Sequence, residues 1–306
     1  MRPVLSVVLG ASLLLVGCGT RSTDFSDLPG DAAERAKLCF GAAQTFRKAG
    51  ADAGVDAAEL ARRQSIESEM REATLIDDFV PAGAWEAFDV EANRQLNTGN
   101  WLLDLNRCKI GYGIGEPEPL PSLPEDEGDR LFVCAMASAI KARGSDVSRP
   151  IILQHDPQGF HFAHMLVGRE GVDRLASRMT DVHRAGGRIL LQGAVDSFVD
   201  RCVEEHPTAA LDHPVQLPEE EPLRAGICSY VSGALIGGGA DNPLRGEYLP
   251  RVERLAVPLG RAGEGISPAE LRLLEQEIEK KVGALGPSTS IFAACEKAYL
   301  GDASIT

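Results

Sequence analysis

Six of the seven cysteines fall into three pairs with nearly the same spacing, and this spacing constrains the fold more than any other feature. The pairs are Cys39/Cys108, Cys134/Cys202 and Cys228/Cys295, with separations of 69, 68 and 67 residues. The first cysteine of the pair recurs after 95 and then 94 residues. Six cysteines allow many disulfide connectivities, but each copy of this repeat contains only two. The sequence therefore predicts three tandem units, each closed by its own disulfide.

A second motif recurs at the start of each unit. A Leu-Pro pair is followed by an acid two residues after the proline, an arginine four residues later and the cysteine four later again. The three copies are Leu28, Pro29, Asp31, Arg35 and Cys39; Leu123, Pro124, Asp126, Arg130 and Cys134; and Leu217, Pro218, Glu220, Arg224 and Cys228. The pattern predicts a helix start, because the helix dipole favours an acid at the N-terminus and residues four apart share a face. We expect each arginine to pair with the acid four residues before it, and the alternative is a site for an anion or a partner carboxylate.

Small residues recur at two further places in the repeat. Gly99, Gly193 and Gly286 each stand nine residues before the second cysteine. They predict a helix break or a close contact, followed by the last helix of each unit. Ala43, Ser138 and Ser232 each stand four residues after the first cysteine, where a small side chain would let another helix approach closely.

The composition and the periodicity favour helices. Aromatic residues make up only 5% of the chain, which suits helices better than sheets. Ser267-Pro268-Ala269-Glu270 is a capping box with proline at the first helical position, and an apolar stripe from Leu271 to Val282 follows it. Asp56 begins a similar pattern in the first unit. The predicted fold is all-α, with three tandem disulfide-stapled units of three or four helices each.

The repeat also predicts the domain organisation. Two segments rich in proline and acidic residues separate the units, and such segments are extended and semi-rigid. The units are therefore either strung out along the chain or packed together. The predicted divisions are a signal peptide (residues 1–17), a tether (18–28), unit 1 (29–112), a linker (113–122), unit 2 (123–206), a second linker (207–216) and unit 3 (217–306).

The first seventeen residues read as an export signal, with Arg2 at the start and a mostly apolar run from Val4 to Val16. The run ends in Leu15-Val16-Gly17-Cys18, which resembles the lipobox of bacterial lipoproteins. The resemblance implies cleavage before Cys18 and attachment of acyl chains such as palmitate to that cysteine. Gly19 after the cysteine resembles the outer-membrane sorting pattern. The expected location is the bacterial cell envelope, with a membrane anchor at Cys18 and the body of the protein facing the periplasm.

The chain is strongly acidic. Its formal net charge is −14, and loss of Arg2 with the leader leaves 30 basic against 45 acidic residues, a net charge of −15. Such a body repels phosphate backbones, so nucleic acid is an unfavourable partner. An exported chain with paired cysteines is also expected to form its disulfides.

The polar residues show no catalytic pattern. All six histidines lie in or just after unit 2, and His161 and His164 share a helical face. They are weak candidates for a metal site, because zincin spacing and a clear third ligand are missing. Surface or capped histidines are the simpler interpretation, and pH sensing is a further alternative. Gly233–Asn242 is glycine-rich but lacks the lysine of a phosphate loop, and the sequence points to no cofactor.

We therefore expect a non-catalytic, lipid-anchored envelope protein whose three repeated units bind or scaffold a protein of the cell envelope. Repetition would supply several similar surfaces and avidity for a multivalent partner. A small-ligand or metal-binding periplasmic lipoprotein that uses the histidine-rich unit 2 is the alternative. An unrecognised hydrolase is a third hypothesis, although no motif supports it.

Overall fold

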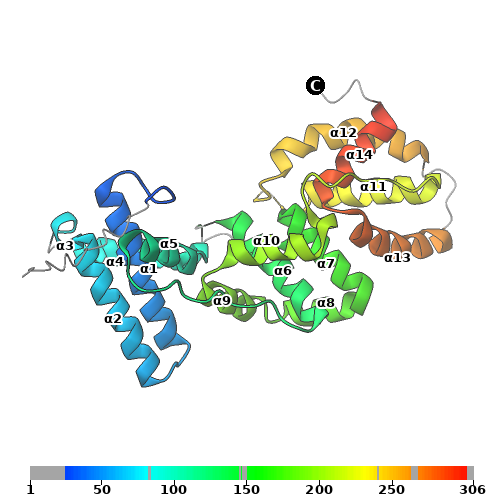
Figure 1. Cartoon of the computed structure of the whole chain (residues 1–306). Helices are drawn as coiled ribbons and strands as arrows, with labels where there is room; N and C mark the ends of the chain where they lie inside the picture. The colour runs from blue at the N-terminus through cyan, green and yellow to red at the C-terminus, as the bar shows by residue number, and fades with distance from the viewer. Residues whose placement is uncertain are drawn as a thin grey trace, which may run out of the picture.

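The computed structural model describes residues 25–81, 84–144, 146, 150–239, 241–262 and 268–301. Every regular element in these residues is a helix, so the predicted all-α fold is confirmed (Figure 1). The predicted leader, the lipidation site Cys18 and the capping residue Ser267 lie outside the described residues. None of the helices within the described ranges combines the length and the apolar character that crossing a membrane requires.

The helices fall into three groups along the chain, separated by the two linkers. The first third of the chain contains α1 (Ala32–Asp52), α2 (Ala57–Thr74), α3 (Ile76–Phe79), α4 (Trp85–Thr98) and α5 (Trp101–Tyr112). The middle contains α6 (Glu127–Arg143), η2 (Leu153–His155), α7 (Pro157–Glu170), α8 (Val172–Met179), α9 (Val182–Gln192), α10 (Val195–Glu205) and η3 (Pro207–Ala209). The last third contains α11 (Glu221–Ile236), α12 (Arg245–Ala262), α13 (Pro268–Leu285) and α14 (Ser288–Leu300).

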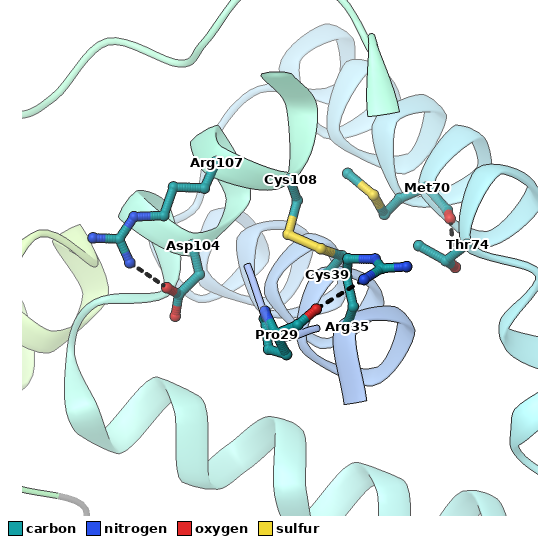
Figure 2. The surroundings of a disulfide bond; sticks show 8 residues. All are labelled: Pro29, Arg35, Cys39, Met70, Thr74, Asp104, Arg107 and Cys108. Atoms are coloured by element: carbon teal, nitrogen blue, oxygen red, sulfur yellow. Dashed lines mark hydrogen bonds and ion pairs between the residues drawn. A yellow bond between two sulfur atoms is a disulfide. The ribbon is translucent and has the colours of Figure 1, made fainter. Parts of the chain in front are cut away.

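The disulfides join the first helix of each third to its last helix. Cys39–Cys108 links α1 to α5, Cys134–Cys202 links α6 to α10, and Cys228–Cys295 links α11 to α14. These are the pairs predicted from the spacing. All six cysteines are fully buried, and Figure 2 shows the first pair enclosed between its two helices. Each disulfide therefore crosslinks a hydrophobic core at its centre.

The helix starts follow from the repeated motif. Asp31 caps α1 by accepting the Glu34 N–H at 2.8 Å, and Asp126 caps α6 by accepting the Asp129 N–H at 2.8 Å. Side-chain caps of this kind satisfy a backbone donor that the helix leaves free. Glu220 holds the same position before α11, but its side chain makes no capping bond. The predicted helix start is thus confirmed in all three copies.

The hydrophobic clusters show how the parts of the chain contact one another. Two clusters lie within residues 28–114 and one within residues 131–209. The third part, residues 223–295, has its own cluster, which also contains Phe160 from α7. Helix α7 packs extensively against α13. The middle and last parts are therefore packed together rather than strung out.

The first linker is fixed to both of its neighbours. Asn106 of α5 donates to the Glu118 carbonyl at 2.8 Å and accepts the Glu118 N–H at 2.6 Å. The Glu118 carboxylate is buried and accepts from Lys109 at 2.6 Å and from Arg62 at 2.8 and 2.9 Å. Further along the linker, the Pro121 carbonyl accepts from Arg201 of α10 at 2.9 Å. The extended segment thus forms specific hydrogen bonds along its length.

Candidate functional site

Two of the three repeated arginines bind backbone carbonyls, and the third pairs with a carboxylate. Arg35 donates to the Pro29 and Gly30 carbonyls at 2.8 and 3.2 Å (Figure 2), and Arg130 donates to the Pro124 and Glu125 carbonyls at 3.1 and 3.3 Å. Arg130 also lies 2.9 Å from the Glu205 carboxylate, and Arg224 pairs with Glu221.

The predicted pairing with the acid four residues earlier is therefore wrong. The acids at two of these positions, Asp31 and Asp126, point their carboxylates at the first turn of their own helices. Arg35 and Arg130 instead donate to the carbonyls of the segment that leads into the helix, and fix the direction from which that segment arrives. These contacts give the arginines a structural role inside their own units.

Two of the repeated glycines lie against each other across the contact between units 1 and 2. The Leu102 N–H donates to the Gly193 carbonyl, and the Val195 N–H donates to the Gly99 carbonyl, both at 2.9 Å. Both glycines have φ near +70°, which disfavours other residues. A Cβ on Gly99 would collide with Val195, and one on Gly193 would collide with Trp101, which stands at the repeat position equivalent to Val195. The predicted helix break and close contact are both confirmed here, and the contact is nearly two-fold symmetric.

The third glycine is covered by a different part of the chain. Gly286 lies against the second linker, where a Cβ would stand 3.3 Å from the His213 ring, 3.3 Å from the Thr208 carbonyl and 3.5 Å from Val215. The linker is held in place by Ser290, whose hydroxyl donates to the Leu211 carbonyl at 2.7 Å. Unit 3 therefore does not repeat the contact that units 1 and 2 make.

The predicted metal candidates His161 and His164 lie in the seam between α7 and the last third of the chain. The His164 Nδ1–H donates to the Phe160 carbonyl at 2.8 Å, and its Nε2 accepts from the Tyr230 hydroxyl of α11 at 2.8 Å. His161 is fully buried and hydrogen-bonds through Nε2 with the Thr208 hydroxyl at 3.2 Å. Within the described ranges, no group of three or more His, Cys, Asp or Glu side chains is arranged to hold a metal ion.

Burial shifts the pKa values of His161, in α7, and of Asp156, the N-cap of α7, in opposite directions. Burial lowers the pKa of His161 to about 4, and the neighbouring His164, His206 and His213 act in the same direction. Burial raises the pKa of Asp156 to about 6, against hydrogen bonds from the backbone of Gly159 and Gln158. Asp156 precedes Pro157 and caps α7, and an acid before proline is a signal for a helix N-cap.

These pKa shifts predict that the free energy of unfolding depends on pH in two opposing ways. The stability that neutral His161 contributes is complete above pH 6.5 and is lost as the pH falls through 4, a change of about 3 kcal/mol. The stability that neutral Asp156 contributes is complete below pH 3.8 and is lost as the pH rises through 6, again a change of about 3 kcal/mol. The two changes should nearly cancel in the unmodified protein between pH 4 and 6.5.

Urea unfolding at pH 7, 5.5 and 4.5 would test this compensation. Asp156→Asn should make the protein lose stability on acidification, and His161→Gln should make it gain stability. His183→Gln, at an exposed position of α9, is the matched control and should leave the pH profile unchanged. If the free energy of unfolding changed with pH in the same direction in the Asp156 and His161 variants, the two opposing pKa shifts would be contradicted.

Units 1 and 2 carry an open groove at equivalent positions of the repeat. Groove 1, of 710 Å³, lies between α1, α4 and α5, and groove 2, of 410 Å³, lies between α6, α9 and α10. Six lining positions correspond through the cysteine and glycine spacing. They are Pro29, Glu34, Leu38, Gln95, Thr98 and Asp104 in groove 1, and Pro124, Asp129, Val133, Ile189, Gln192 and Phe198 in groove 2.

The helices of unit 3 lie closer together, and its open pocket, of 500 Å³, is lined by residues of α11, α12 and α13 that include Gly226 and Ile278. Lys37 of groove 1 and Phe132 of groove 2 correspond to Gly226 of α11. A Cβ on Gly226 would stand 2.5 Å from the Ile278 side chain of α13. The absence of a side chain therefore allows α13 to approach α11 closely, and Ile227, at the position of Leu38 and Val133, is fully buried.

Comparison with protein-family models, curated proteins and solved structures finds no match to this chain. The features that bear on its function are therefore the paired grooves, the reciprocal glycine contact and the buried histidine seam.

The start motif and the glycines were visible in the sequence. The grooves were not, because their walls combine residues from three helices, and only the positional equivalence of the units could have indicated them.

Proposed function

We propose that the protein is a non-catalytic, lipid-anchored protein of the bacterial cell envelope that binds a partner protein through its repeated helical units. The observation that carries this proposal is the recurrence of an open groove at equivalent positions of units 1 and 2. The anchor at Cys18 and the envelope location rest on the resemblance of the first residues to a lipobox.

The chemistry of the grooves favours a protein segment as the occupant. Leu38, Val80 and Phe88 give groove 1 an apolar wall, and Val133, Ile189 and Phe198 do the same in groove 2. Charged and amide side chains stand beside them. An apolar centre with a polar surround is the usual composition of protein interfaces. Two grooves on one chain also raise the apparent affinity for a partner that reaches both.

Photo-crosslinking in intact cells tests the proposal. Benzoylphenylalanine would replace Leu38 in groove 1 or Val133 in groove 2, and Glu69 on the exposed side of α2 as the control. We expect the same envelope protein to be captured from both grooves and not from the control position. A Cys18→Ser chain, which cannot be acylated at this residue, should lose that product. Capture of no protein from either groove, with the variants folded and exported, would refute the proposal.

A further inference from the structure

Five of the six histidines gather where unit 2, the second linker and unit 3 meet. His155 lies in η2, His161 and His164 lie in α7, His206 ends unit 2, and His213 lies on the linker. The remaining histidine is exposed on α9. Imidazole is the side chain whose ordinary pKa lies nearest to neutral pH. This contact, which we call the histidine seam, therefore contains side chains whose charge changes in mild acid.

Glycines of unit 3 bring its backbone against two of these residues. A Cβ on Gly238, in the loop between α11 and α12, would stand 2.3 Å from the His155 ring, and one on Gly283 of α13 would stand 2.6 Å from the His164 carbonyl. The His164 ring also accepts the Tyr230 hydroxyl of α11 at 2.8 Å. Helix α7 lies directly against α13 (Figure 1). Unit 3 is thus seated on the face of unit 2 that carries the histidines.

The surroundings of His161 are divided between the two sides of the seam. Its Nε2 hydrogen-bonds with the Thr208 hydroxyl of η3 at 3.2 Å, and unit 2 holds η3 through a bond from Gln158 to the Ala209 carbonyl at 3.0 Å. The Gly286 backbone, between α13 and α14, lies near the ring on the side of unit 3. Departure of unit 3 would therefore bring water to a ring that is now fully buried.

The titratable neighbours of His161 are other histidines. Burial, and then His164, His206 and His213, lower the pKa of His161 to about 4. Burial also lowers the pKa of His164, although its hydrogen bond to the Phe160 carbonyl acts in the opposite direction. The closed seam therefore disfavours charged imidazoles, and protonation would bring like charges together inside it.

Other charged groups lie around the seam on every element that packs there. They are Glu279 of α13 near Tyr230, then Asp212, Arg224 and Lys297 near His213, and Lys141, Arg143, Asp156 and Asp241 near η2.

Asp156 titrates in the opposite direction to His161, since burial raises its pKa to about 6. That burial comes mainly from unit 2. The Asp156 carboxylate accepts the Gly159 N–H at 2.6 Å, and in the lining of the small pocket beside it only Asp241 and Pro243 come from unit 3. Asp156 therefore remains buried when unit 3 departs, and it does not oppose opening of the seam.

We propose that mild acid opens the histidine seam, so that unit 3 departs from α7 while each unit stays folded around its own disulfide. Water then reaches His161 and His164, which take up protons without the cost of burying a charge. Opening also uncovers Phe160, which now packs in the hydrophobic cluster of unit 3. The inference does not depend on the proposed partner protein.

Single-molecule energy transfer on the full mature chain, with Cys18→Ser to remove the anchor, tests the inference. Dyes are attached to p-acetylphenylalanine at Arg184 of α9 and Val257 of α12, two exposed positions on either side of the seam. The ratio of open to closed molecules should rise at least about 30-fold between pH 7.5 and pH 5. This is the change expected for one group whose pKa is 6.5 in water and about 4 in the seam. Circular dichroism should show unchanged helix content.

Substitutions at the histidines separate this effect from others. His161→Gln should remove the factor of about 30, because glutamine cannot be protonated. His164→Gln can still accept the Tyr230 hydroxyl and should also reduce the rise. His183→Gln, outside the seam, is the matched control and should leave the rise unchanged.

Two further controls test the remaining assumptions. Asp156→Asn keeps a capping side chain and should show the same rise as the parent chain. Dyes at Glu69 of α2 and Arg184 of α9 report on the glycine contact of units 1 and 2, whose backbone hydrogen bonds involve no histidine. This pair should show no change with pH.

An absence of open molecules at pH 4, an undiminished rise in both the His161 and His164 variants, or an equal change across the glycine contact would each overturn the inference. A rise that occurs only in Asp156→Asn would do so as well, because Asp156 would then hold the parent seam closed. Loss of helix content over the same pH range would also overturn it, since acid would then unfold a unit rather than separate two.

Discussion

Replacing Cys39 and Cys108 together by alanine should lower the free energy of unfolding by about 4 kcal/mol. The disulfide closes a loop of 69 residues, and in the chain-entropy model a loop of that length stabilises the folded state by roughly this amount. Alanine keeps the site apolar and leaves no buried polar group. The loss of stability therefore reports mainly the loss of the crosslink. Urea unfolding measured by circular dichroism gives the value.

Reduction of the unmodified protein provides a control for this experiment. Dithiothreitol should destabilise the parent chain further than it destabilises the variant, because the parent has one more disulfide to lose. A loss below about 1 kcal/mol in the variant would mean that the unfolded chain is already compact, and that packing of α1 on α5 maintains this part of the fold without the crosslink.

Replacing Glu118 by alanine should cost about 3 to 5 kcal/mol, since it leaves a buried charge without its partner. Lys109 is only 4% exposed, and its ammonium lies 2.6 Å from the Glu118 carboxylate. Burial opposes ionisation of Glu118, but hydrogen bonds from Arg62 and Lys109 outweigh it and lower its pKa. The stability from this group is therefore complete above its ordinary pKa of 4.5 and is lost as the pH falls through the lower folded value.

The matched control removes both charges. Lys109→Met combined with Glu118→Leu should be far less destabilising than Glu118→Ala alone, because no ion remains buried without a partner. Urea unfolding at pH 7 and pH 3 would measure both effects. If the double variant lost as much stability as the single variant, the loss would come from detachment of the linker from α5 rather than from the buried charge.

The sequence predicted those features that depend on spacing along the chain. The cysteine pairs were predictable because each copy of the repeat contains two cysteines and no choice remains. The helices after Asp31 and Asp126 were predictable because capping is local: the acid bonds to a backbone N–H three residues later. The same reasoning failed for Arg35, whose acceptors are the Pro29 and Gly30 carbonyls, because a side-chain pattern carries no information on free backbone acceptors.

Features that combine distant segments could not be predicted in the same way. The glycine positions indicated a close contact, but the sequence does not show that Gly99 contacts unit 2 while Gly286 contacts the second linker. The histidines were visible as a group, yet the burial of His164 against Tyr230 of α11 follows from the packing of two units.

The reciprocal contact of Gly99 and Gly193 also limits how the chain can be extended. A contact that uses the same face on both sides is saturated by two members, whereas a head-to-tail contact can be continued without end. A third copy therefore cannot be added through this face, and α13 and α14 instead pack against α7. Inserting another copy of the unit should produce a molecule with a new kind of junction, and not the regular superhelix that a solenoid protein forms when a repeat is added.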